Sequence, residues 1–146
     1  MKKLSLYLLL LLFTVGKTFA QTGENAIIGI WESDKKDVRM EIYKENGKYY
    51  GKYLWGAQIV EKDGVTSKKD SKNPEPKLRT RNLIGIVSLT GLTWDDGEYV
   101  DGKIYNAPSG EYYKCKAWMK DGKMNLRGYM GISLLGQTAT FHRYKP

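Results

Sequence analysis

The sequence predicts an all-β protein, built as an antiparallel up-and-down barrel of about eight strands. Three observations favour this class. Apolar and polar residues alternate over several segments, Asn-Gly and Asp-Gly pairs separate these segments, and no segment after the N-terminus has a sustained helical period. A two-sheet sandwich is the alternative architecture.

The N-terminus has the pattern of a secretory signal peptide. Two lysines follow Met1, an apolar run extends from Leu4 to Val15, and Thr18-Phe19-Ala20 supplies small residues for cleavage after Ala20. The apolar run is shorter than the ~20 residues that a membrane-spanning helix needs. We therefore expect residues 1–20 to be removed and the protein to be exported, to the periplasm or the extracellular space.

The remaining residues, 21–146, fit one domain of ordinary size. The signal peptide carries three lysines and no acid, so its removal lowers the formal net charge from +8 to +5. The basic charge favours an anionic partner or an envelope surface, although solvated lysines on outward strand faces account for it equally well. Cys115 is the only cysteine, which excludes an internal disulfide.

The first three strands are expected over Ile27–Trp31, Asp37–Lys44 and Lys48–Trp55. The first is apolar and β-branched, and the second alternates between apolar and polar residues. Asn46-Gly47 joins the second and third strands with a pair that is typical of a type I′ hairpin turn.

A long segment without strand character, Glu61 to Arg81, interrupts the series of hairpins. After it, the apolar run Leu83–Leu89 predicts a strand that is buried on both faces. Turns at Asp95-Asp96-Gly97, Ala107–Gly110 and Asp121-Gly122 then separate the later segments.

The remaining strands are expected over Glu98–Tyr105, Glu111–Lys120, Lys123–Tyr129 and Thr138–Tyr144. In the second of these, alternation places Cys115 and Ala117 inside and Lys114 and Lys116 outside. Charged outward faces predict a water-soluble barrel rather than one that spans a membrane.

Gly29-Ile30-Trp31 near the start, with Arg143 in the last strand, resembles the pattern of lipocalins and other calycins. In that superfamily the tryptophan closes one end of the barrel and a basic side chain lies across its indole. The resemblance implies a cation–π contact between Arg143 and Trp31.

A closer resemblance, over most of the predicted domain, is to the bacterial family called domain of unknown function 2147. The motifs that carry it are DSKNP (residues 70–74), LIG (83–85), GKIY (102–105), PSG (108–110), LRGYMGIS (126–133) and Gly136. The resemblance implies a small exported β-domain and supplies no catalytic residues.

The residues offer little support for a catalytic or metal site. His142 is the only histidine and Cys115 the only thiol, so no set of zinc ligands is evident and we expect no cofactor. A Cys–His pair is formally conceivable, but Cys115 lies on the apolar side of its strand, where core packing is the more common role. Export argues against a nucleic-acid partner.

Aromatic residues are the stronger candidates for ligand binding. Tyrosine combines an apolar ring with a hydroxyl group, and a barrel of eight strands can hold one small ligand. We expect Tyr49, Tyr53 and Tyr113 to line the interior, with Arg79 and Arg81 near its mouth. The alternative is that these tyrosines fill the core.

The second half of the long segment has two interpretations. If Asp70 bonds near Asn73-Pro74 and Arg79 or Arg81 pairs with a carboxylate, this motif is an ordered lid over one barrel end; otherwise the arginines bind an anion. The first is favoured.

Three functions are consistent with these observations. The first is a binding module for a small amphipathic ligand or an envelope component. The second is a calycin-like enzyme, in the manner of phenolic acid decarboxylases, acting on an aromatic or carboxylate substrate in the barrel interior. The third is a structural or stress-related protein that acts through its surface. The sequence leaves the oligomeric state open.

Overall fold

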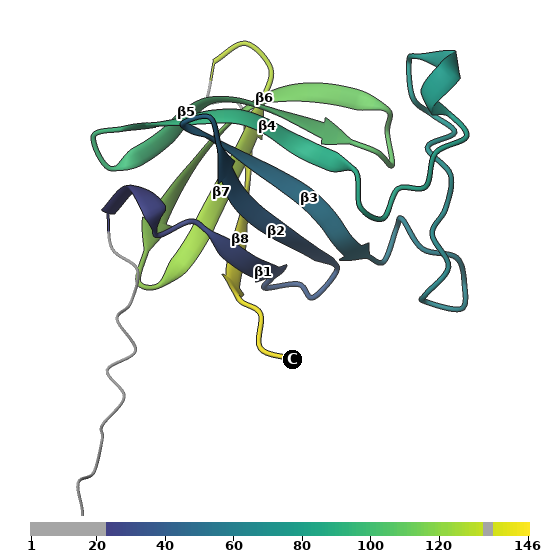
Figure 1. Ribbon diagram of the computed structural model, residues 1–146, viewed down its shortest axis with the longest axis horizontal. Helices are drawn as coiled ribbons and strands as arrows, with labels where there is room; N and C mark the ends of the chain where they lie inside the picture. The colour runs from purple at the N-terminus through teal and green to yellow at the C-terminus, as the bar shows by residue number, and fades with distance from the viewer. Residues whose placement is uncertain (1–22, 133–135) are drawn as a thin grey trace, which may run out of the picture.

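The protein is a closed antiparallel β-barrel whose eight strands follow one another around the wall in sequence order. The computed structural model describes residues 23–132 and 136–146, and Figure 1 shows its strands wrapping around a single interior. Pairing of Trp31 with Arg143 and of Ser33 with Phe141 closes the barrel. The predicted up-and-down barrel is confirmed, and the sandwich alternative is wrong.

The strands differ from the predicted boundaries by a few residues. They are β1 (Gly29–Ser33), β2 (Val38–Glu45), β3 (Lys48–Gly56), β4 (Val87–Asp95), β5 (Glu98–Asn106), β6 (Glu111–Lys120), β7 (Lys123–Tyr129) and β8 (Gln137–Arg143), with short 3-10 helices η1 (Gly23–Asn25) and η2 (Pro76–Leu78).

Tight hairpins gather at one end of the barrel. The turns at Asn46-Gly47, Asp96-Gly97 and Asp121-Gly122 each have positive φ at both residues, as a type I′ turn requires. In an up-and-down barrel the connections alternate between the two ends, so these three turns share the end at which β1 begins. The longer connections lie at the opposite end.

That first end is plugged by the N-terminal segment and by aromatic side chains. Trp31 is fully buried and donates its indole N–H to the carbonyl of Ile27 (2.7 Å). The guanidinium of Arg143 lies 4.1 Å from the centre of the Trp31 indole ring and donates to the carbonyls of Ala26 and Ile28 (2.5 Å each). Tyr99 donates to the carbonyl of Glu24 (2.8 Å). Among the described residues, these contacts therefore cover this end of the barrel.

Gly29 is needed for this plug. Its φ is +136°, and a Cβ placed there would lie 2.2 Å from Nη1 of Arg143. The glycine of the Gly-x-Trp motif thus leaves room for the cation that covers the indole.

The predicted strand over Leu83–Leu89 is wrong in its first half. Leu83 and Ile86 are buried, but Gly85 has φ +89° and the segment curves before β4 begins at Val87. The Gly85 N–H donates to the carbonyl of Tyr53 (2.7 Å). The apolar run therefore packs under the long connection instead of adding a strand there. Similarly, Ile27 and Ile28 precede β1, which extends to Ser33.

The connection between β3 and β4 projects from the side of the barrel and carries η2 (Figure 1). Its first half is an ordered turn rather than a loose linker. The carboxylate of Asp63 accepts the backbone N–H groups of Val65 and Thr66 (2.9 Å each), and the Trp55 indole donates to the carbonyl of Gly64 (2.9 Å).

The second half is fixed by the buried carboxylate of Asp70, which is 1% exposed. Tyr105 of β5 donates its hydroxyl proton to one oxygen (2.6 Å), and Asn73 and Arg81 donate to the other (2.8 Å each). Burial, and then the hydrogen bond to Asp70, raise the pKa of Tyr105. These are the contacts that we expect if the motif has a structural role, with Asp70 bonded near Asn73 and Arg81 paired with a carboxylate.

A backbone contact ties the same segment to the β5–β6 turn. The carbonyl of Lys72 occupies the space where a Cβ of Gly110 would lie, only 2.2 Å away, and Gly110 has φ +77°. Lys72 also donates from its ammonium group to the carbonyl of Pro108 (2.6 Å). The DSKNP, GKIY and PSG motifs of the sequence therefore meet at one junction.

The predicted signal peptide, with its cleavage point after Ala20, lies outside the described residues, as does Ser133. In the part of the chain that the structure describes, no helix has the length and apolar character needed to cross a membrane.

We expect Asp70→Ala to lower the free energy of unfolding by about 3–5 kcal/mol, because Arg81 and the buried Tyr105 hydroxyl would lose their shared acceptor. Chemical denaturation measures the effect. Asp63→Ala in the same connection is the control, with an expected loss of about 1 kcal/mol or less. Equal losses in both variants would contradict a structural role for Asp70.

Tyr99 should make stability sensitive to alkaline pH. Burial raises its pKa from 10.0 to about 12. A phenol whose pKa is higher in the folded state stabilises fully below its unfolded pKa, and this contribution is lost as pH rises through the folded pKa. The melting temperature should therefore fall between about pH 10 and 12, and less steeply in Tyr99→Phe than in the parent protein. Identical slopes would show that Tyr99 is not responsible.

Candidate functional site

The end opposite the plug is open. Three adjoining hollows of about 420, 530 and 570 Å³ lie there, and all three are lined by Tyr53. We call them together the mouth cavity. Its walls come from the β1–β2 turn, the start of the β3–β4 connection, the β5–β6 turn, and Met130 and Gly136 between β7 and β8.

The inner walls of the mouth cavity are mainly apolar. Val38 and Met40 of β2 contribute from one side, and Ile104 of β5 from the other. Leu126, Ala139 and Phe141 complete the wall at β7 and β8. Met40, Leu126 and Phe141 are buried, whereas Val38 and Ile104 are half-buried and Ala139 is exposed. Apolar side chains that point inward yet reach solvent are typical of a pocket that receives an apolar group.

Gly128 leaves space in this wall. It follows Leu126 on the inward side of β7, and a Cβ there would meet nothing closer than Ile104 Cγ2 at 3.7 Å. Gly102 of β5, which like Gly128 is paired with Cys115, is by contrast closely packed, since its Cβ would lie 2.6 Å from Leu92 and 2.8 Å from Cys115. Among the described residues, the space beside Gly102 is thus filled and the space beside Gly128 is not.

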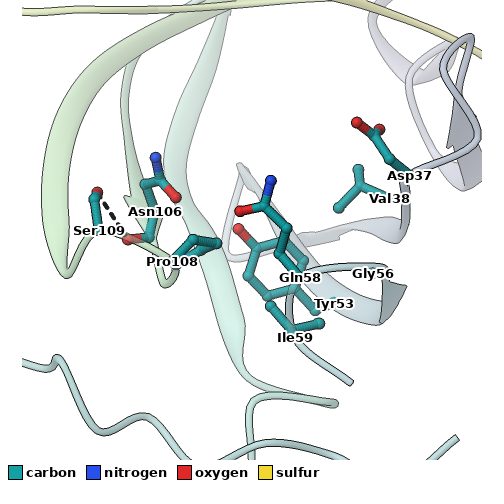
Figure 2. Close-up of a pocket in the computed structure, with 9 residues that line it drawn as sticks. All are labelled: Asp37, Val38, Tyr53, Gly56, Gln58, Ile59, Asn106, Pro108 and Ser109. Atoms are coloured by element: carbon teal, nitrogen blue, oxygen red, sulfur yellow. Dashed lines mark hydrogen bonds between the residues drawn. The ribbon is translucent and has the colours of Figure 1, made fainter. Parts of the chain in front are cut away.

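Tyr53 marks the boundary between the two halves. It is 7% exposed, and its hydroxyl donates to the backbone carbonyl of Tyr105 (3.2 Å). Figure 2 shows it between Asp37 and Val38 on one side and Asn106 and Pro108 on the other. Burial raises the pKa of Tyr53, so its phenol is neutral at physiological pH.

Charged groups of the mouth cavity lie on its rim at the β1–β2 turn. Asp37 is exposed and accepts the hydroxyl proton of Ser33 (2.6 Å). Asp34 accepts a hydrogen bond from Lys123 (2.8 Å) and lies 3.0 Å from Nδ1 of His142; these contacts lower the pKa of the Asp34 carboxyl, that of Lys123 most. This side of the rim therefore carries two carboxylates, one of them paired with Lys123, together with Lys35.

The three tyrosines selected from the sequence lie in different places. Tyr53 lines the mouth cavity, as does Tyr113, whose hydroxyl donates to Glu111 (2.6 Å). Tyr49 is fully buried near the plugged end, where its ring meets Tyr99 edge-on at 5.0 Å between centroids. Tyr49 packs in the core instead of lining the cavity.

Neither selected arginine lines the mouth cavity. Arg81 is paired with Asp70. Arg79 is exposed and donates from Nε to the carbonyl of Asn73 (2.8 Å), which holds the turn before η2. Pro74 is exposed between these groups. The guanidinium groups thus serve contacts within the β3–β4 connection.

The thiol and the imidazole are far from forming a nucleophilic pair. Cys115 is fully buried in the core, and burial raises the pKa of its thiol to about 12. His142 lies on the outer side of β8 between Glu32 and Asp34. Within residues 23–132 and 136–146 no group of three or more potential ligands could hold a metal ion.

Several cavity residues were not selected from the sequence, notably Asp37, Val38, Ile104 and Gly128. Gly128 carried a readable signal, because a glycine at an inward position of an alternating strand removes a wall side chain. For the others the signal is only their alternation, which does not show how far along the barrel each residue lies.

A similar solved structure supports this description of the fold. The chain is 29% identical to protein HP1028 from the human pathogen Helicobacter pylori, described as belonging to the lipocalin family. The match has a TM-score of 0.70 and covers 82% of this chain and 83% of HP1028. A comparison with curated proteins finds no match.

The sequence also matches a family described as "Uncharacterized protein conserved in bacteria (DUF2147)" over residues 29–143, which extends from the first residue of β1 to the last of β8. Because this match includes the whole barrel and the connection anchored by Asp70, the protein belongs to the DUF2147 family.

Proposed function

We propose that this protein is an exported binding protein that holds a small amphipathic molecule in the mouth cavity. The observation that carries the proposal is the contrast between the two barrel halves. The plugged half is packed with buried side chains, whereas the open half has apolar walls that reach solvent and a glycine where a wall side chain would stand.

The chemistry of the walls supports an amphipathic ligand. Val38, Ile104 and Ala139 can cover an apolar chain or ring, and Asn106, Gln137 and the rim carboxylate of Asp37 can meet a polar end. The hollows have volumes in the ~300–1,000 Å³ range of pockets that hold small molecules. The lipocalin description of HP1028 agrees with a ligand-holding barrel.

Export is the second part of the proposal. The N-terminal pattern of lysines, apolar run and Thr18-Phe19-Ala20 supports secretion into the periplasm or beyond. Ligands from the cell envelope are then available to the protein, and they are a natural first panel for binding experiments.

The other functions have less support. An enzyme would need an acid or base beside the inner tyrosines. The charged residues that line the mouth cavity, Asp34, Lys35 and Asp37, lie on its rim, and Glu111, which accepts the Tyr113 hydroxyl proton, is exposed. A surface-acting protein would need an exposed apolar patch beside the long connection. Val65 is exposed within that connection, whereas Met130 and Ile132 are exposed after β7.

The binding test uses the neutral fluorescent probe N-phenyl-1-naphthylamine and the variant Gly128→Leu. We expect the parent protein to bind the probe and Gly128→Leu to lower its affinity about tenfold or more, because the leucine side chain would occupy the cavity. Displacement by lipids, phenolic compounds and cell-wall fragments then screens for the ligand class.

Lys114→Leu is the matched control, since it adds the same apolar side chain on the exposed outer side of β6. It should leave probe affinity within about twofold of the parent. Equal affinities of the parent and Gly128→Leu would place the probe outside the barrel and overturn the proposal.

A further inference from the structure

A fourth hollow, of about 400 Å³, lies under the β3–β4 connection next to the mouth cavity. It shares two lining residues, Gln58 and Pro108, with the mouth cavity. Three of its lining residues are Lys68, Lys69 and Lys72, so we call it the lysine hollow. Gln58 of the β3–β4 connection and Pro108 of the β5–β6 turn therefore lie between the lysine hollow and the mouth cavity.

The ammonium groups of two of these lysines lie at the boundary formed by Gln58 and Pro108. Lys68 donates from Nζ to the backbone carbonyl of Gln58 (3.2 Å), and Lys72 donates to the backbone carbonyl of Pro108 (2.6 Å). An ammonium group has three N–H donors. Each contact therefore fixes the position of a positive charge and leaves donors for a further acceptor.

The charge of the lysine hollow is not balanced by neighbouring acids. Among the described residues the salt bridges of lysines involve Lys44, Lys52, Lys77, Lys116 and Lys123, and none involves Lys68, Lys69 or Lys72. Asp70 is close in sequence, but its carboxylate is buried and paired with Arg81. Lys69 donates to the neutral side chain of Asn82 (2.7 Å).

We propose that Lys68 and Lys72, supported by Lys69, bind the anionic end of the ligand while its apolar part lies in the mouth cavity. This inference rests on the proposed function and narrows its ligand to an amphipathic anion, with a carboxylate or phosphate group. The lysine hollow supplies positive charge at the edge of an apolar space, which is the arrangement that such a molecule requires.

The rim carboxylate of Asp37 is the competing charged contact. It lines the mouth cavity across from the boundary formed by Gln58 and Pro108, and it would attract an amine instead of an acid. Asp37 accepts the hydroxyl proton of Ser33 and, like the lysines, keeps capacity for further hydrogen bonds. An amphipathic amine is therefore a necessary arm of the test.

The experiment compares dodecanoate, dodecanol and dodecylamine as competitors of N-phenyl-1-naphthylamine on the full mature protein. All three have the same chain and differ in the charge of the polar end. At low ionic strength we expect dodecanoate to bind about tenfold more tightly than dodecanol. About 0.5 M salt should reduce this preference, because exposed charges are then screened within ~4 Å.

The variant Lys68→Gln/Lys72→Gln should lose most of the preference for dodecanoate while binding dodecanol as before, since each exposed ion pair accounts for about two- to fivefold. Glutamine keeps an N–H donor for the carbonyls of Gln58 and Pro108. Lys48→Gln/Lys120→Gln is the matched control, because it removes the same charge at exposed sites of the plugged end. Lys68→Arg/Lys72→Arg should restore the preference.

Each other outcome decides against the inference in a recognisable way. Equal binding of dodecanoate and dodecanol, or a preference that survives in Lys68→Gln/Lys72→Gln, overturns it and leaves the proposed function standing. Tightest binding of dodecylamine assigns recognition to Asp37. If inorganic phosphate binds tightly, loses this binding in Lys68→Gln/Lys72→Gln, and dodecanoate binds no more tightly than dodecanol, the lysine hollow is a site for free anions. Failure of the probe and all three ligands to bind removes the proposed function itself.

Discussion

The buried carboxylate of Asp70 is the interaction on which the open end of the barrel depends. A charge in the protein interior is tolerated only when hydrogen-bond donors surround it. Tyr105, Asn73 and Arg81 supply those donors, and Tyr105 belongs to the barrel wall. The position of the long β3–β4 connection is therefore fixed relative to β5, and both the mouth cavity and the lysine hollow take part of their walls from this connection.

The two ends of the barrel differ because the connections between strands are short at one end and longer at the other. Short type I′ turns and the Trp31–Arg143 contact use few residues and pack tightly, so they close an end completely. Longer connections cannot pack over the other end in the same way, and there the inward positions are not all covered.

The sequence predicted the fold better than the site, and β3 shows why. Alternation along β3 puts Tyr49 and Tyr53 on the same side of the strand, and the structure shows that this side faces inward. Alternation could not show that Tyr49 lies near the plug and Tyr53 at the cavity, because depth along the barrel depends on which end the N-terminal segment closes. Likewise, the apolar run Leu83–Leu89 predicted a strand buried on both faces, whereas Gly85 and Val87 are exposed and β4 begins only at Val87. The hydrogen bond between Gly85 and Tyr53 is a tertiary contact, which a local pattern does not show.

The assignment of positive charges follows from the different chemistry of arginine and lysine. A planar guanidinium with several fixed donors suits a buried carboxylate, and Arg81 uses two nitrogens on one oxygen of Asp70. The sequence favours a structural role of Arg79 and Arg81, with anion binding by these arginines as the alternative. The structure assigns them to local contacts, whereas the compact ammonium groups of Lys68 and Lys72 each bind one carbonyl and keep further donors. An anion near the mouth would therefore meet lysines, because the carboxylate that folds the connection has already neutralised the arginine.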